Sequence, residues 1–195
     1  MKISIRYKSL LVAGVIITAA TAVASIALLT RTPPSSPAPA AESPLGRLRW
    51  LENPQPVAAT PFSDESGTPR TLHDFAGRVL VVNFWATWCG PCVQEMPTLD
   101  ALQATLGGDG FAVVAISQDR GGSGVAKPFL EANGWRHLAL YTEPDAHFVK
   151  DAALAGLPTS LIVDRNGREV ARLEGAAAWN SPEMVATLRK LMAAP

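Results

Sequence analysis

The sequence predicts a mixed α/β sheet with helices on both faces. Val79–Trp85 and Phe111–Ser117 are almost continuously apolar, which is typical of central strands covered on both sides. Residues with helical spacing lie between these runs, and the last part of the chain holds a hairpin signal followed by a helix. Strand, helix and strand, then hairpin and helix, is the pattern of a mixed sheet with helices on each face.

The first half of this domain is expected to alternate strands and helices. Apolar residues recur at helical spacing from Met96 to Leu106, and Gly107 and Gly108 end that helix. A shorter helix stops near Gly134. In chain order we predict strands at 57–62 and 70–72, the central strand Val79–Trp85, a helix at 91–106, the central strand Phe111–Ser117 and a helix at 127–133.

The second half is expected to end in a hairpin and a helix. Residues 164–167, Asp-Arg-Asn-Gly, are a hairpin signal of the Asn-Gly type. Ser181 is a suitable N-cap for a terminal helix, with Pro182 in its first turn. The other predicted elements are a short strand at 138–141, a helix at 146–155 closed by Gly156, and strands at 160–163 and 169–173.

An apolar stretch precedes the domain. Residues 10–29 contain no charge and no proline, and about 20 such residues span a bilayer as a helix. Three basic residues before the stretch favour a cytoplasmic N-terminus. We therefore expect a cytoplasmic segment at 1–9, a single-pass anchor at 10–29 in the inner (cytoplasmic) membrane, and the rest of the chain in the periplasm or extracytoplasmic space. Cleavage as a signal stays open, because small-x-small triplets occur at 22–24 and 38–40.

Residues 30–44 are predicted to be a proline-rich linker to a domain at 45–195. The linker has no apolar periodicity, and proline-rich segments are extended and semi-rigid at about 3 Å per residue. On that basis it would reach on the order of 40 Å from the membrane.

The composition argues against several classes of protein. Acidic and basic residues are equal in number at 17 each, so the net charge gives no indication of a nucleic-acid partner. The chain has no phosphate-binding loop and no nucleotide-binding glycine pattern. The glycine-rich residues 121–124 are predicted to be a flexible surface loop. We expect a monomer without a cofactor and without nucleic acid.

Cys89 and Cys92 are the only cysteines, and they lie where the first central strand gives way to a helix. A thiol at a helix start is favoured as thiolate, which is the species that attacks a disulfide. A second cysteine three residues on can close a disulfide with the first. The pair therefore predicts thiol–disulfide exchange.

Two other interpretations of the cysteine pair stay open. A structural disulfide over about four residues would constrain the unfolded chain by only roughly 2 kcal/mol. A zinc site needs four ligands, and the chain adds only the scattered His73, His137 and His147. We therefore expect no metal, and we interpret the histidines as structural or exposed.

The chain carries the motifs Asn83-Phe-Trp-Ala-Thr-Trp-Cys-Gly-Pro-Cys92, Glu95-Met-Pro97, Gly156-Leu-Pro-Thr159 and Asn166-Gly167. Together they resemble the thioredoxin superfamily, and within it the membrane-anchored TlpA/ResA branch. The likeness covers residues 45–195, and residues 118–155 match the strand–helix element that this branch adds to the minimal fold. Residues 178–181, Ala-Trp-Asn-Ser, resemble the TlpA subgroup.

The resemblance implies roles for the cysteines and for a carboxylate. Cys89 would be the exposed nucleophile and Cys92 the buried resolving thiol. Glu95 would accept a proton from Cys92, whereas its alternative is an ordinary exposed helix carboxylate. Thioredoxins carry a buried aspartate where this chain has Asn83, and an amide cannot take a proton. Glu95 is therefore the better candidate for the proton acceptor.

The resemblance also implies a substrate-docking surface. Pro158 matches the cis-proline of the family, and Leu157 before it would present its backbone to a substrate strand. Trp88 would belong to the docking surface. Gly90 and Pro91 form the dipeptide of reducing thioredoxins, which implies a low potential, about −270 mV for thioredoxin itself.

The expected function is an exported, anchored thiol:disulfide reductase. The resemblance implies clients such as apocytochrome c or copper-site proteins of cytochrome oxidase, and electrons from a DsbD- or CcdA-type membrane protein. A thiol peroxidase on the same fold is an alternative, but it would need a threonine where Ala86 stands. A copper chaperone is the other alternative, although such chaperones usually space their cysteines more widely.

Overall fold

The computed structural model describes residues 44–194, whose strands form one eight-stranded sheet in the order β1-β8-β7-β4-β5-β6-β2-β3. The β4–β5 and β5–β6 pairs are parallel and the other pairs are antiparallel, so the predicted mixed sheet is confirmed. The strands are β1 (Arg49–Pro56), β2 (Phe62–Asp64), β3 (Pro69–Arg70), β4 (Val79–Trp85), β5 (Phe111–Ser117), β6 (Tyr141–Thr142), β7 (Thr159–Val163) and β8 (Arg168–Glu174).

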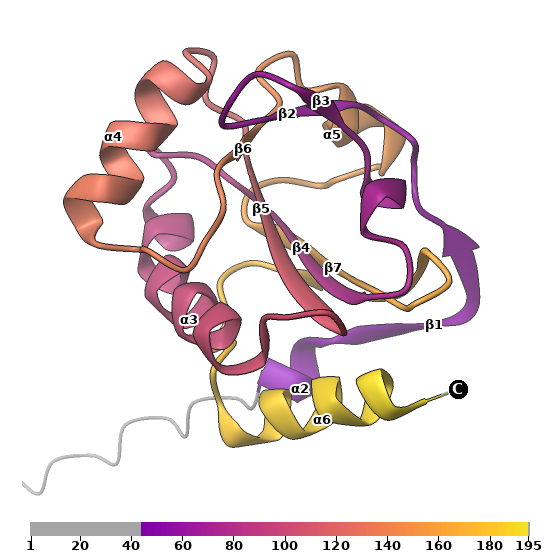
Figure 1. Ribbon diagram of the computed structural model, residues 1–195. Coiled ribbons are helices and arrows are strands. Elements are labelled where there is room, and N and C mark those ends of the chain that lie inside the picture. The colour runs from indigo at the N-terminus through magenta and orange to yellow at the C-terminus, as the bar shows by residue number, and fades with distance from the viewer. Residues whose placement is uncertain (1–43, 195) are drawn as a thin grey trace, which may run out of the picture. The chain divides into compact units, whose positions relative to one another are not determined.

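Helices lie on both faces of the sheet, as predicted. One apolar cluster joins the sheet to α3, α4 and α6, and a second joins the opposite face to η1 and α5. The short helix α2, where the described residues begin, contacts the C-terminal α6, and Figure 1 shows the two side by side. The helices are α2 (Pro44–Arg47), the 3-10 helix η1 (Leu72–Phe75), α3 (Gly90–Leu106), α4 (Ser123–Asn133), α5 (His147–Asp151) and α6 (Pro182–Ala193).

The apolar sequence of the central strand β4 follows from burial of both its faces. Its side chains alternate between the two clusters, so that Val81 faces the α3 side and Val82 the other. Both faces are buried, which requires an almost continuous apolar run. Asn83 is the one polar residue in β4, and by the same alternation it lies on the face that α3 covers.

Several predicted boundaries agree with the structure. The predicted ranges of both central strands match β4 and β5. Gly167 has φ +71° in the hairpin between β7 and β8, a conformation that glycine adopts readily. Ser181 caps α6, because its side chain accepts a hydrogen bond from the Met184 amide at 3.3 Å.

The strands predicted at 57–62 and 70–72 are wrong over most of their residues, and β1 was not predicted. Of residues 57–62, Phe62 alone lies in a strand, as the first residue of β2, and β1 ends just before them at Pro56. β1 shows no apolar alternation because it is an edge strand, mostly exposed, whose register against β8 shifts between Trp50 and Gln55. The strand expected at 70–72 ends at Arg70, and Leu72 is buried as the first residue of η1.

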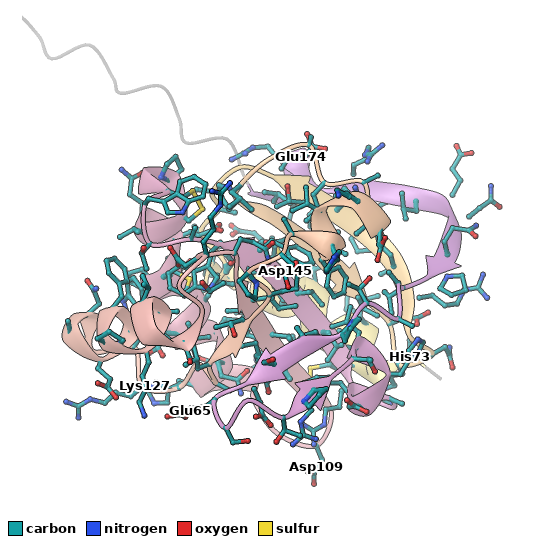
Figure 2. All side chains as sticks on the ribbon, turned by 90° about the horizontal axis from the view of Figure 1, so that it is seen from above. Glu65, His73, Asp109, Lys127, Asp145 and Glu174 are labelled. Atoms are coloured by element: carbon teal, nitrogen blue, oxygen red, sulfur yellow. A yellow bond between two sulfur atoms is a disulfide. The ribbon has the colours of Figure 1, made fainter. Side chains whose placement is uncertain are left out.

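Helices and strands in the second half of the domain also differ in length from the predicted ones. Residues 121–124 are not all loop, since α4 begins at Ser123 behind Gly122, whose φ is +54°. The strand expected at 138–141 is reduced to β6, and the helix expected at 146–155 is the short α5. A salt bridge of 2.7 Å joins Lys127 on α4 to Glu65 in the β2–β3 turn (Figure 2).

The predicted anchor at 10–29 and most of the predicted linker lie outside the described residues. Within residues 44–194, no helix is both long and apolar enough to cross a membrane.

Candidate redox site

The two cysteines form a disulfide at the start of α3. Cys89 and Cys92 are bonded with an S–S distance of 2.03 Å and a Cα–Cα distance of 5.2 Å. Cys89 is the N-cap of α3, and its sulfur accepts a hydrogen bond from the Cys92 amide at 3.3 Å. A sulfur that already receives a helix N-terminal N–H is well placed to carry negative charge once the disulfide is reduced.

The cysteines differ in exposure, though less than predicted. Cys92 is 0% exposed, as expected for the inner cysteine, but Cys89 is only 6% exposed in this oxidised form. The expectation of an exposed Cys89 is therefore wrong here, because both cysteines join the apolar cluster under α3. Around Cys89, Gly90 and Pro91 are exposed and Trp88 is 71% exposed. We call Trp88, Gly90 and Pro91 the rim.

Asp119 accepts hydrogen bonds from Thr87 in the loop between β4 and α3, next to the rim. This buried carboxylate follows β5 and accepts hydrogen bonds from the Thr87 amide at 3.0 Å and the Thr87 hydroxyl at 2.8 Å. It also accepts one from the Ser117 hydroxyl at 2.8 Å. Sequence analysis missed Asp119. The available signal was a polar run directly after a buried strand that is parallel to the strand leading into the cysteines.

Glu95 is buried on the same helix as the cysteines, so its interpretation as an exposed carboxylate is wrong. It is 2% exposed. Its Oε1 accepts a hydrogen bond from the side-chain amide of Asn83 at 2.8 Å. Its Oε2 accepts hydrogen bonds from the backbone amide of Ala177 and the indole N–H of Trp179, both at 2.9 Å. Burial raises the pKa of Glu95 above its usual range, and these hydrogen bonds partly oppose that rise.

The structure brings Asn83 and Glu95 together, although they come from different elements. The Asn83 Nδ2 also donates to the Ser160 hydroxyl on β7 at 2.9 Å. Sequence analysis gave Trp179 no chemical role; only the tail resemblance at 178–181 pointed to it. We call Asn83, Glu95 and Trp179, together with the Ala177 amide, the cage.

Pro158 has the cis peptide bond that the resemblance implies, between Leu157 and Pro158. Pro158 is buried, and its carbonyl accepts a hydrogen bond from the Gly175 amide at 2.8 Å. β7 begins at the next residue, Thr159, which pairs with Phe84 near the end of β4. Leu157 packs against the cluster that contains both cysteines.

Within the described residues, the contacts of the three histidines do not involve the cysteine pair. His73 is exposed, His137 contacts Asp100 at 2.9 Å, and His147 lies 3.6 Å from Glu143. In the part of the chain from 44 to 194, no group of three or more His, Cys, Asp or Glu residues is arranged to hold a metal ion.

Comparisons with known proteins agree with this geometry. A model of the Redoxin family matches residues 34–188. The thiol-disulfide oxidoreductase ResA of Bacillus thuringiensis is 28% identical over 113 residues, which cover 58% of this chain. The match spans 64% of the length of that relative. The thiol:disulfide interchange protein HelX of Rhodobacter capsulatus is 32% identical over 134 residues, covering 69% of this chain and 66% of HelX.

Solved structures share the fold. A crystal structure assigned as the thiol:disulfide interchange protein DsbE of Chlorobium tepidum is 29% identical, with a TM-score of 0.60, and covers 73% of this chain and 96% of its own. A thiol:disulfide interchange protein from a Bacteroides species, solved in solution, has a TM-score of 0.61 at 24% identity over 74% of this chain and 92% of its own. The expected thioredoxin-like arrangement of the domain is therefore present.

Proposed function

Since this chain belongs to the redoxin family, we propose that it is a thiol:disulfide oxidoreductase that reduces disulfides in partner proteins. The observation that carries the proposal is the Cys89–Cys92 disulfide at the start of α3, with the buried carboxylate of Glu95 on the same helix. The names of the relatives, thiol-disulfide oxidoreductase and thiol:disulfide interchange protein, support the same chemistry.

The reaction begins from the reduced dithiol. The Cys89 thiolate attacks one sulfur of the partner disulfide, a Cys89–partner disulfide forms, and the second partner sulfur leaves as a thiolate that takes up a proton. Cys92 then loses its proton and attacks the Cys89 sulfur. The partner leaves with two electrons and two protons gained, and the chain is left with the Cys89–Cys92 disulfide.

Glu95 is the proposed acceptor of the Cys92 proton. A carboxylate with a raised pKa is a stronger base than an exposed one, and it remains effective only while it is ionised. The three N–H groups of the cage stabilise that ionised form. Pro158 and Leu157 would receive the substrate strand, and the rim residues Trp88, Gly90 and Pro91 would contact the substrate around Cys89.

The proposed setting is the outer face of the inner membrane. The sequence supports it through the apolar residues 10–29 and the linker at 30–44. Electrons would come from a DsbD- or CcdA-type membrane protein. The proposed clients are apocytochrome c or copper-site proteins of cytochrome oxidase, in cytochrome c maturation or copper-site assembly.

Two measurements test the activity. Reduced full-length protein should reduce insulin disulfides stoichiometrically, and the Cys92→Ser protein should capture its client as a mixed disulfide that can be identified from membranes. The double variant Cys89→Ser/Cys92→Ser is the control and should capture nothing. Peroxide consumption without reduction of any protein disulfide would instead indicate a thiol peroxidase.

The anchor has its own test. Native protein should sediment with membranes, and a cut within residues 30–44 should release the domain. A mature N-terminus at or beyond Ala22 would contradict the anchor.

A further inference from the structure

The segment from Glu174 to Trp179, which lies between β8 and α6, donates hydrogen bonds to the Glu95 carboxylate. Two of its N–H groups, the Ala177 amide and the Trp179 indole, donate to the same oxygen, Oε2, at 2.9 Å each. The Thr98 hydroxyl, nearly one turn after Glu95, accepts from the Trp179 amide at 3.1 Å and lies 3.2 Å from the Ala177 carbonyl. The segment is therefore bonded to α3 at two successive points.

Arg47, from α2, holds the other end of this segment. Its guanidinium donates to the Ala176 carbonyl at 2.8 Å and to the Glu174 carbonyl at 2.6 Å. Gly175 lies between these carbonyls with φ +83°, and a Cβ there would lie only 2.7 Å from Arg47 Nη2. The approach of the guanidinium therefore depends on glycine at this position.

Among residues 44–194, Arg47 is the one charged side chain that acts on the Glu95 carboxylate through its charge. Asn83 on β4 and Ser160 on β7 carry no charge, and Arg47 is the charged side chain that favours the ionised carboxylate. On its own helix, Cys89 and Cys92 become titratable neighbours only when the disulfide is reduced. Burial acts in the opposite direction and raises the pKa of Glu95.

We propose that the segment Glu174–Trp179, fastened by Arg47, is a positioning strap that holds the Glu95 carboxylate in its charged form. Arg47 and Trp179 are then positioning residues: neither reacts with a sulfur, and both act through Glu95. The inference rests on the proposed role of Glu95 in thiol–disulfide exchange. A loosened strap would raise the pKa of Glu95 further, so that the carboxyl would stay protonated to higher pH and could not accept the Cys92 proton there.

The direct test is the titration of Glu95, observed by carbon-13 NMR of the side-chain carboxyl in the full-length oxidised protein. Trp179→Phe removes one N–H donor and keeps an aromatic ring, so the midpoint should rise by about one pH unit. Arg47→Gln removes the charge at an exposed site, so the midpoint should rise by about half a unit, less at high salt. Arg49→Gln is the matched control and should not move it.

Arg47→Gln keeps the test valid even where Trp179→Phe fails to fold, because Arg47 is exposed. An unchanged Glu95 midpoint in Arg47→Gln would overturn the strap. A second readout separates the two proposals: the pH profile of insulin reduction should move upward with the Glu95 midpoint, slowing exchange below it by up to about tenfold per unit. A midpoint that moves without any change in this profile would leave the strap standing and refute the role of Glu95 in exchange.

Discussion

The rim and the cage were predictable from the sequence to very different degrees. The rim, Trp88, Gly90 and Pro91, is contiguous with the cysteines and exposed. The cage draws Asn83 from β4, Glu95 from α3 and Trp179 from the segment before α6. A local motif thus specifies the exposed residues around Cys89, whereas the contacts of the Glu95 carboxylate depend on the tertiary fold.

The largest expected effect is the different outcome of replacing each of the two cysteines. Cys89→Ser should abolish attack on a protein disulfide, whereas Cys92→Ser should still attack and then stall as a mixed disulfide. Alkylation of the reduced protein near neutral pH should label Cys89 first, since Cys92 is fully buried and Cys89 caps the helix. Faster labelling of Cys92, or turnover by Cys92→Ser at the native rate, would reverse the assigned roles.

The next largest effect is expected from replacing Glu95, the carboxylate of the cage. Glu95→Gln keeps the size of the side chain but cannot accept a proton, so disulfide exchange should slow by about 100-fold and lose its dependence on the Glu95 midpoint. Insulin reduction across pH measures this effect. Glu52→Gln, on the exposed part of β1, is the matched control. A native pH profile in Glu95→Gln would reduce the cage to a structural feature.

The raised pKa of Glu95 also has a consequence for stability. The folded protein holds the Glu95 proton more tightly than the unfolded chain, whose ordinary value is 4.5, so the folded state binds more protons above that pH. The free energy of unfolding from this group should therefore fall as pH rises from about 4.5 through the raised pKa. Denaturant titrations of native protein and Glu95→Gln across pH measure this contribution as the difference between their free energies of unfolding. A difference, native minus variant, that rises with pH over this window would contradict the burial argument.

A smaller effect concerns the support of the rim. Asp119→Ala removes three hydrogen bonds from a buried carboxylate and should lower the free energy of unfolding by about 3 kcal/mol. Exchange should slow as well, because Thr87 no longer holds the loop before Cys89. Asp109→Ala, at an exposed turn labelled in Figure 2, is the control and should lie within about 0.5 kcal/mol of the native value. Equal stabilities of the two variants would show that Asp119 supports nothing.

The same contrast explains how far the sequence could predict the fold. β4 and β5 were predicted at their observed bounds because burial on both faces leaves a continuous apolar run. β1 was missed because an exposed edge strand needs no such pattern, and its pairing with β8 is invisible in its own residues. Likewise, Glu95 was singled out by its spacing from Cys92, but its donor Trp179 is 84 residues away along the chain. Such contacts follow from the fold and not from any local period.

The smallest expected effect is confined to the rim. Trp88 is 71% exposed, so Trp88→Ala should change the free energy of unfolding by less than about 0.5 kcal/mol. Its proposed role is contact with a protein partner, and so kcat/KM for insulin should fall several-fold, by about 1 kcal/mol of lost contact. The rate with a small linear disulfide such as hydroxyethyl disulfide should stay native, because that substrate does not reach beyond Cys89. Trp50→Ala, another exposed tryptophan at 47%, is the matched control. Equal losses with both substrates would place Trp88 in the chemistry of Cys89 and not in docking.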